Sequence, residues 1–195
     1  MKSFQICLLV CAALSVSGCN KNGQEQQAQQ EQPPVLSQSA ASTPTSAGGI
    51  TWTVPRGWTV EGERPMRIGT YAVPAASGDA DGGECAAYYF GVDQGGDVQA
   101  NIDRWAMQFE GVSGLNQTTS EIHGMQVTNV VLKGTYLAPA GPMMQSQGKK
   151  AHYALLGAIV DAPKGRVFFK FTGPEKTVEA SKADFDGLLA SMTKQ

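Results

Sequence analysis

A stretch of alternating apolar residues in the last third of the chain restricts the fold more than any other feature. Between residues 149 and 161 two apolar sets alternate: Ala151, Tyr153, Leu155 and Ile159 on one side, and Ala154, Leu156, Ala158 and Val160 on the other. A strand with two apolar faces predicts a central place in a sheet that is covered on both sides. The turn Pro163-Lys164-Gly165 and the apolar run 166–171 predict that this strand pairs back as a hairpin.

Two amphipathic helices are predicted to supply the cover. Asp97 can cap a helix whose buried face would carry Val98, Ile102, Trp105, Ala106 and Phe109. Pro174 suits the first turn of a second helix, whose face would carry Val178, Phe185, Leu188, Leu189 and Met192.

Shorter patterns predict further strands at 50–54, 66–73, 85–90, 117–122 and 125–132, with His123-Gly124 as the turn between the last two. Strands, a helix, strands and a helix follow one another along the chain. This order predicts an α+β fold in which helices flank an antiparallel β-sheet.

The N-terminus has the pattern of an export signal. Lys2 is followed by an apolar run over residues 4–16, which is shorter than the roughly 20 residues of a transmembrane helix. The run ends in Val16-Ser17-Gly18-Cys19, which resembles the lipobox of bacterial lipoproteins. That resemblance implies cleavage before Cys19 and a diacylglycerol on its thiol, and two or three acyl chains hold a protein stably on a membrane. The alternative is an ordinary secretory signal with a chance cysteine.

These observations predict three segments. Residues 1–18 would be a lipoprotein signal peptide, and residues 19–48 a lipidated cysteine with a disordered tether, since the segment is rich in Gln, Ser, Ala, Pro and Thr. Residues 49–195 would form one globular domain of ordinary size. Asn20 after the cysteine resembles the sorting signal for the outer membrane of Gram-negative bacteria. We therefore expect lipid anchorage to the cell envelope, at the periplasmic face of the outer membrane.

Charge and cysteine content narrow the function classes. The chain has 15 basic and 17 acidic residues, a net charge of −2, which does not favour a nucleic-acid partner. Of its four cysteines, Cys7 and Cys11 leave with the signal and Cys19 is lipidated, so Cys85 cannot pair within the mature domain. Cys85 lies in an apolar strand pattern and is expected to be a buried small hydrophobe, with a reactive thiol as the alternative.

Several segments resemble those of PsbP-like domains. They are Pro55-Arg56-Gly57-Trp58 after the opening strand, the run from Tyr88-Tyr89-Phe90-Gly91 to Trp105-Ala106-Met107-Gln108-Phe109, and Phe168-Phe169-Lys170-Phe171-Thr172-Gly173-Pro174-Glu175 at the last helix. The resemblance covers most of residues 49–195 and implies an α/β/α sandwich built on an antiparallel sheet. It also implies a binding or assembly role and no particular reaction, because this fold serves many functions.

No catalytic constellation is visible in the sequence. The glycines of Gly91 to Gly96 could suggest a phosphate loop, but the Lys-Ser/Thr ending is missing, so a tight turn into the helix is expected. His123 and His152 have no metal-ligand neighbours at suitable spacing, and structural or solvated roles are expected for both. We therefore predict no catalytic residue, no metal ligand and no cofactor.

Two non-catalytic functions remain as hypotheses. The first is a binding or assembly module for an envelope protein, with a contact surface on an apolar loop of Pro and Gly: Tyr136, Leu137, Pro142, Met143 and Met144. The second is a carrier of a small ligand or of copper, because Met125, Met143 and Met144 with His152 could supply soft ligands. Trp52, Trp58 and Tyr71 could join a contact surface, but core positions are expected for them.

Overall fold

The computed structural model of the protein describes residues 45–139 and 146–195. The expectations for the signal peptide, Cys19 and the tether concern residues outside these ranges, as do those for Pro142, Met143 and Met144. No helix among the described residues is both long enough and apolar enough to cross a membrane.

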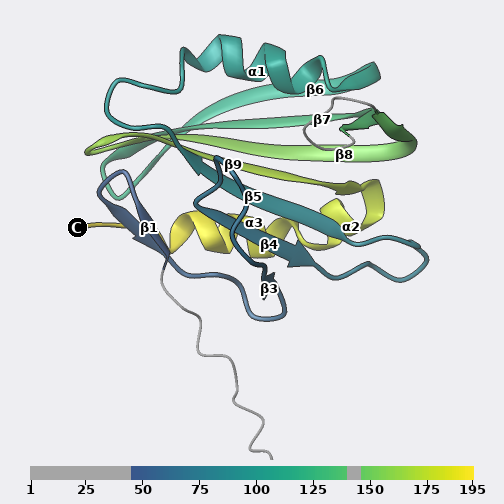
Figure 1. Cartoon of the computed structure of the whole chain (residues 1–195), viewed down its shortest axis with the longest axis horizontal. Helices are drawn as coiled ribbons and strands as arrows, with labels where there is room; N and C mark the ends of the chain where they lie inside the picture. Colours follow the sequence, from purple (N-terminus) through teal and green to yellow (C-terminus); the bar gives the residue numbers. More distant parts are fainter. Residues whose placement is uncertain (1–44, 140–145) are drawn as a thin grey trace, which may run out of the picture. The chain divides into compact units, whose positions relative to one another are not determined.

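Seven strands form one antiparallel sheet in the order β3-β4-β5-β9-β8-β7-β6 (Figure 1). Their bounds are β3 (Thr59–Val60), β4 (Gly69–Val73), β5 (Gly83–Tyr89), β6 (Phe109–Ile122), β7 (Met125–Pro139), β8 (Ser146–Ala162) and β9 (Gly165–Pro174). The predicted β8–β9 hairpin is confirmed. Strand β8 is an inner strand: Leu155 and Ile159 pack in one core cluster, and Leu156 and Val160 in the other.

The helices cover opposite faces of this sheet (Figure 1). Helix α1 (Val98–Ala106) lies on one face, where Ile102 and Trp105 join Leu155, Ile159 and Phe168. Helices α2 (Glu175–Ala180) and α3 (Lys182–Ala190) lie on the other face, and their apolar side chains pack with those of β8 and β9. The predicted N-cap is confirmed, since Asp97 Oδ1 accepts a hydrogen bond of 2.9 Å from the Ala100 amide.

A second, three-stranded sheet joins the two ends of the described chain. Strand β2 (Ile50–Trp52) pairs with β1 (Thr45–Ala47) on one side and with β10 (Thr193–Lys194) on the other. Ile50 and Trp52 are buried in the core on the α3 face. The Trp52 indole donates a 2.9 Å hydrogen bond to the Tyr71 hydroxyl of β4, which links the small sheet to the large one.

The fold class is therefore an antiparallel sheet with few helices, richer in strand than a balanced α/β/α sandwich. Several boundaries differ from the predictions. Phe109 begins β6 and does not extend α1, because the helix is already capped at Met107. Strand β6 is much longer than predicted; it is an exposed edge strand with bulges at Gly111 and Gly114, so it lacks apolar alternation. The last helix is two helices divided at Ser181.

Most buried positions agree with the sequence-based expectations, although Ala151, predicted on an apolar face of the central strand β8, is exposed where the register between β7 and β8 shifts. Trp52, Trp58 and Tyr71 are core residues, which confirms the prediction made for them. Cys85 is fully buried, and burial raises the pKa of its thiol, so it is the inert small hydrophobe that the strand pattern predicted. Residues 66–68 are not part of a strand, because Met66 adopts a left-handed conformation and is exposed.

Candidate functional site

Helix α1 covers only part of its face of the sheet, and a cleft opens beside it. This cleft, called the sheet cleft below, has a volume of about 350 Å³. Its lining comes from the loop before β4, strands β5, β7, β8 and β9, and the end of α1: Arg67, Gly82, Gly83, Glu84, Ala86, Tyr88, Gln108, Tyr136, Ala138, Lys150, Tyr153, Lys170 and Thr172. Its volume lies at the lower end of the range of small-molecule sites.

The strand register places Lys170 in the floor of the cleft, between two small residues. Ala86 of β5 and Gly157 of β8 pair with Lys170 on either side. The Trp105 ring of α1 lies directly over Gly157, since a Cβ atom built there would come within 2.3 Å of Trp105 Cζ3. These small neighbours leave room above the floor of the sheet, and the lysine side chain extends into it.

Lys170 has no carboxylate partner among the described residues. Its ammonium donates to Oε1 of Gln108 and lies 5.5 Å from the centre of the Tyr136 ring, in a cation–π arrangement. Burial, followed by the nearby Arg67, lowers the pKa of Lys170 to about 8, although Glu84 acts in the opposite direction. A bound anion would stabilise the charged form of this amine.

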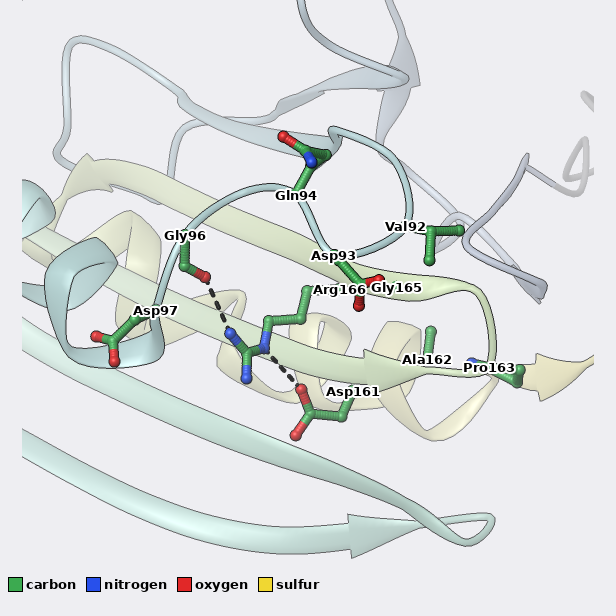
Figure 2. A pocket seen from close by; sticks show the side chains of 10 residues that line it. All are labelled: Val92, Asp93, Gln94, Gly96, Asp97, Asp161, Ala162, Pro163, Gly165 and Arg166. Atoms are coloured by element: carbon green, nitrogen blue, oxygen red, sulfur yellow. Dashed lines mark hydrogen bonds and ion pairs between the residues drawn. The ribbon is translucent and has the colours of Figure 1, made fainter.

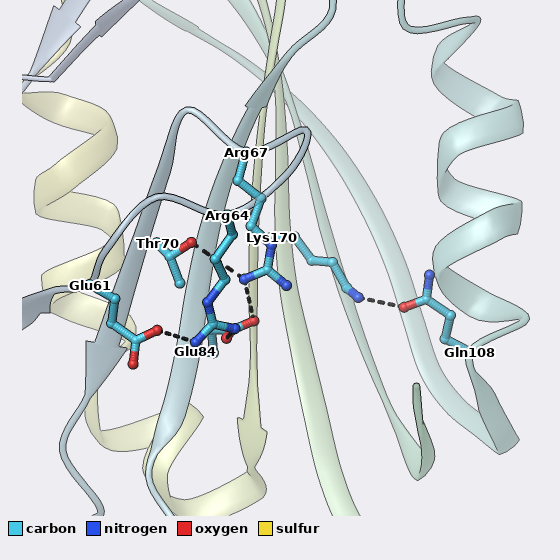
Figure 3. Close-up of polar contacts among 7 residues, drawn as sticks. All are labelled: Glu61, Arg64, Arg67, Thr70, Glu84, Gln108 and Lys170. Atoms are coloured by element: carbon cyan, nitrogen blue, oxygen red, sulfur yellow. Dashed lines mark hydrogen bonds and ion pairs between the residues drawn. The ribbon is translucent and has the colours of Figure 1, made fainter. Parts of the chain in front are cut away.

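The other cations of the site are paired. Glu84 receives Arg67 through one carboxylate oxygen and Arg64 through the other, each at 2.8 Å. Arg67 also contacts Thr70 Oγ1 at 3.4 Å. Figure 3 shows both guanidinium groups directed at Glu84, whereas the Lys170 side chain extends toward Gln108. At the other end, Lys150 pairs with Asp81, which lowers the pKa of that carboxyl.

Aromatic rings form one wall of the cleft. Tyr136 stacks on Tyr153 with ring centres 5.8 Å apart and an angle of 8° between the planes, and it also contacts Phe109 at 5.0 Å. Burial raises the pKa of Tyr136 to about 12, so its hydroxyl stays protonated at physiological pH. The cleft thus combines a partly buried amine, a guanidinium, a carboxylate and phenol groups, a set that suits binding of a polar or anionic ligand.

A second pocket, of about 510 Å³, lies at the loop before α1 (Figure 2). Asp93, Asp97 and Asp161 line it, and its one guanidinium, that of Arg166, bonds to Asp161 and to the Gly96 carbonyl, both at 2.9 Å. Three carboxylates make this loop unsuitable for phosphate. The expected turn into the helix is therefore the better description of Gly91 to Gly96.

The residues singled out from the sequence lie in different places. Tyr136 lines the sheet cleft, and the Leu137 amide donates to the Gln108 carbonyl at 2.8 Å. His123 lies in the predicted turn, and His152 is exposed, with a left-handed backbone conformation at the register shift between β7 and β8. Met125 is buried on the α3 face. Within residues 45–139 and 146–195, no three His, Cys, Asp or Glu residues gather as a metal site.

Arg67, Glu84 and Lys170 were not predicted from the sequence. One signal was present, because Lys170 is the only charge in the apolar run Val167-Phe168-Phe169-Lys170-Phe171 of an inner strand. A charged residue at a position that faces the interior marks a candidate site.

No protein-family model matches the sequence, and no curated protein matches it. Among solved structures, the chain is similar to PA94, a protein of unknown function from Pseudomonas aeruginosa, with 13% identity and a TM-score of 0.46 over 78% of this chain and 96% of that one. It is also similar to the cyanobacterial PsbP (CyanoP) of Synechocystis sp. PCC 6803, with 11% identity and a TM-score of 0.47 over 76% and 88%. We draw no conclusion about function from either likeness.

Proposed function

We propose that the protein is a non-catalytic binding protein of the bacterial cell envelope that takes a small anionic ligand in the sheet cleft. The observation that carries this proposal is the position of Lys170, a partly buried ammonium with no ion-pair partner among the described residues. A lipid on Cys19 would hold the protein at the membrane, and a PsbP-like α/β/α assignment of the domain belongs to the same proposal.

The unpaired charge of Lys170 favours the binding of an anion. Removing a charge from water is unfavourable unless an opposite charge or several hydrogen bonds replace the water. Glu84 already serves two arginines and Asp81 serves Lys150, so neither carboxylate neutralises Lys170. A carboxylate or phosphate in the cleft would supply the missing charge and would raise the pKa of Lys170 toward its ordinary value.

The sequence also favoured an assembly surface around Tyr136 and Leu137 and a copper site that includes Met143 and Met144. Both stay predictions, since the methionines lie outside the described residues. The Tyr136 ring faces the sheet cleft, and this placement favours a ligand site over a protein contact at that residue.

The test uses the purified full chain with acetate and inorganic phosphate as probes, at constant ionic strength set with chloride. NMR of the lysine ε-methylene groups reports the pKa of Lys170, and thermal unfolding reports binding. We expect at least one probe to raise that pKa by one unit or more and to raise Tm. Lys170→Met should abolish the rise in Tm, whereas Lys176→Met, an exposed position on α2, should retain it. If neither probe changes the pKa or Tm, the proposal is wrong.

A further inference from the structure

A smaller, largely aromatic pocket adjoins the sheet cleft. This pocket, called the aromatic pocket below, has a volume of about 200 Å³ and lies between β5, β9 and α1. Tyr88, Gln108 and Lys170 line both cavities, so the two meet at the lysine. The remaining walls of the aromatic pocket are Phe90, Asn101, Arg104, Trp105 and Phe168.

The rings of this pocket are arranged to receive another ring. Tyr88 and Phe90 are stacked, with centres 6.3 Å apart and planes 15° from parallel, and Phe90 meets Phe168 edge-on at 5.8 Å. Phe90 is nevertheless 38% exposed, so part of an aromatic face remains uncovered beside the cation. An apolar cavity of about 150 Å³ can hold benzene, so this pocket has room for one six-membered ring.

A buried polar side chain, that of Asn101, also lines the pocket. The side-chain amide of Asn101, which is buried, donates to the carbonyls of Gly95 and Asp97 at 2.7 and 2.8 Å. Its oxygen therefore faces Arg104, whose Nη1 donates to it at 2.9 Å. Arg104 has no carboxylate partner among the described residues, so the pocket is lined by two positive charges, those of Arg104 and Lys170.

We propose that the ligand is an aryl-substituted carboxylic acid, with its carboxylate at Lys170 and its ring in the aromatic pocket. The proposal rests on the proposed function, because it assigns the anion of the sheet cleft a second, apolar part. A bare anion would leave the uncovered ring of Phe90 unused, and an uncharged aromatic compound would leave Lys170 without a counter-charge. A single ligand of this class satisfies both.

The experiment compares three probes by titration calorimetry on the full chain: acetate, 3-phenylpropan-1-ol and 3-phenylpropionate. We expect 3-phenylpropionate to bind at least tenfold more tightly than either of the others. Phe90→Ala should reduce its affinity at least fivefold, whereas Val92→Ala, an exposed change two residues away, should leave it unchanged. In Lys170→Met the acid and the alcohol should bind equally.

The outcomes separate the two proposals. Affinities for 3-phenylpropionate and acetate within twofold of each other would overturn the aryl-acid inference and leave the anion site standing. Equal binding of the acid and the alcohol to the unaltered protein would also overturn the inference, because the cation would then contribute nothing. Absence of any response to both acetate and inorganic phosphate would overturn the proposed function itself, and the aryl-acid inference with it.

Discussion

The ammonium group of Lys170 lies in a position where burial disfavours its charge. Its strand neighbours Phe169 and Phe171 face the core on the α3 side, and Lys170 itself points to the α1 side between Ala86 and Gly157. The charged and titratable groups that line its two cavities are Arg67 from the loop before β4, Glu84 and Tyr88 from β5, Arg104 from α1, Tyr136 from β7, and Lys150 and Tyr153 from β8. Burial is the main cause of its lowered pKa.

This position predicts a pH dependence of stability. The pKa of Lys170 is about 8 in the folded protein against 10.5 for an ordinary lysine, so the unfolded chain binds more protons between these values. The contribution of Lys170 to the free energy of unfolding should therefore rise as pH increases above 8, and this gain is lost as pH falls back through 8. The raised pKa values of Cys85, Tyr71, Tyr88 and Tyr136 act in the opposite direction, because the unfolded chain releases these protons first, near the ordinary values of 9.0 and 10.0.

Lys170→Met should abolish the rise in stability that Lys170 contributes above pH 8. It should also stabilise the ligand-free protein at pH 7 by on the order of 1–3 kcal/mol, because a pKa shift of one unit corresponds to about 1.4 kcal/mol. Urea unfolding at pH 7, 8, 9 and 10 measures both effects. An unchanged pH slope in the variant would show that another group is responsible.

At the scale of elements, the contact between α1 and β8 depends on one missing side chain. Gly157 lies in an inner strand, where glycine is normally unfavourable, and the Trp105 ring occupies the space that a Cβ would need. This close approach seats the helix against the sheet and fixes Trp105 in the wall of the aromatic pocket.

Gly157→Ala should therefore destabilise the protein, because the new methyl group would lie 2.3 Å from Trp105 Cζ3 and 2.8 Å from Cε3 and would force α1 outward. We expect a loss of about 1–3 kcal/mol in urea unfolding, as for other overpacked cores. The matched control is Gly187→Ala in α3, where a Cβ meets no atom within 4 Å. It should be neutral or stabilising by about 1 kcal/mol. Equal effects of the two changes would contradict the tight fit over Gly157.

Some of these elements could be predicted from the sequence, and others could not. The sequence predicts strand β8 from its alternating apolar residues, the β8–β9 hairpin from a turn, and α1 from its N-cap and its apolar face. All of these signals are local. Strand β6 was only partly predicted, because an exposed edge strand has no buried face to impose alternation. The sheet cleft was not predicted at all. Arg67, Glu84, Gln108, Tyr136 and Lys170 meet only because of the strand order β5-β9-β8-β7, which no local pattern contains.

For the whole molecule, the proposed lipid anchor makes a prediction that is independent of the cleft. Cells grown with an alkyne-tagged fatty acid should label the full chain, and the protein should sediment with membranes. Cys19→Ala should lose the label, since the lipobox thiol is the acceptor, whereas Cys85→Ala should keep it because Cys85 is buried. Labelling that persists in Cys19→Ala would contradict the lipoprotein assignment.

The three-stranded sheet determines how the domain would respond to mechanical load. Tension applied through the chain before Thr45 would reach β1 first, which pairs with β2 at three register positions and contacts β4 through a 3.3 Å hydrogen bond from Tyr71 to Thr45. Strand β2 is held more firmly, because it also pairs with β10 and because its Ile50 and Trp52 side chains are buried in the core. Strand β1 should therefore detach before β2 and the core are disturbed, so that a pull on the proposed lipid anchor would lengthen the connection before it reached the proposed ligand site.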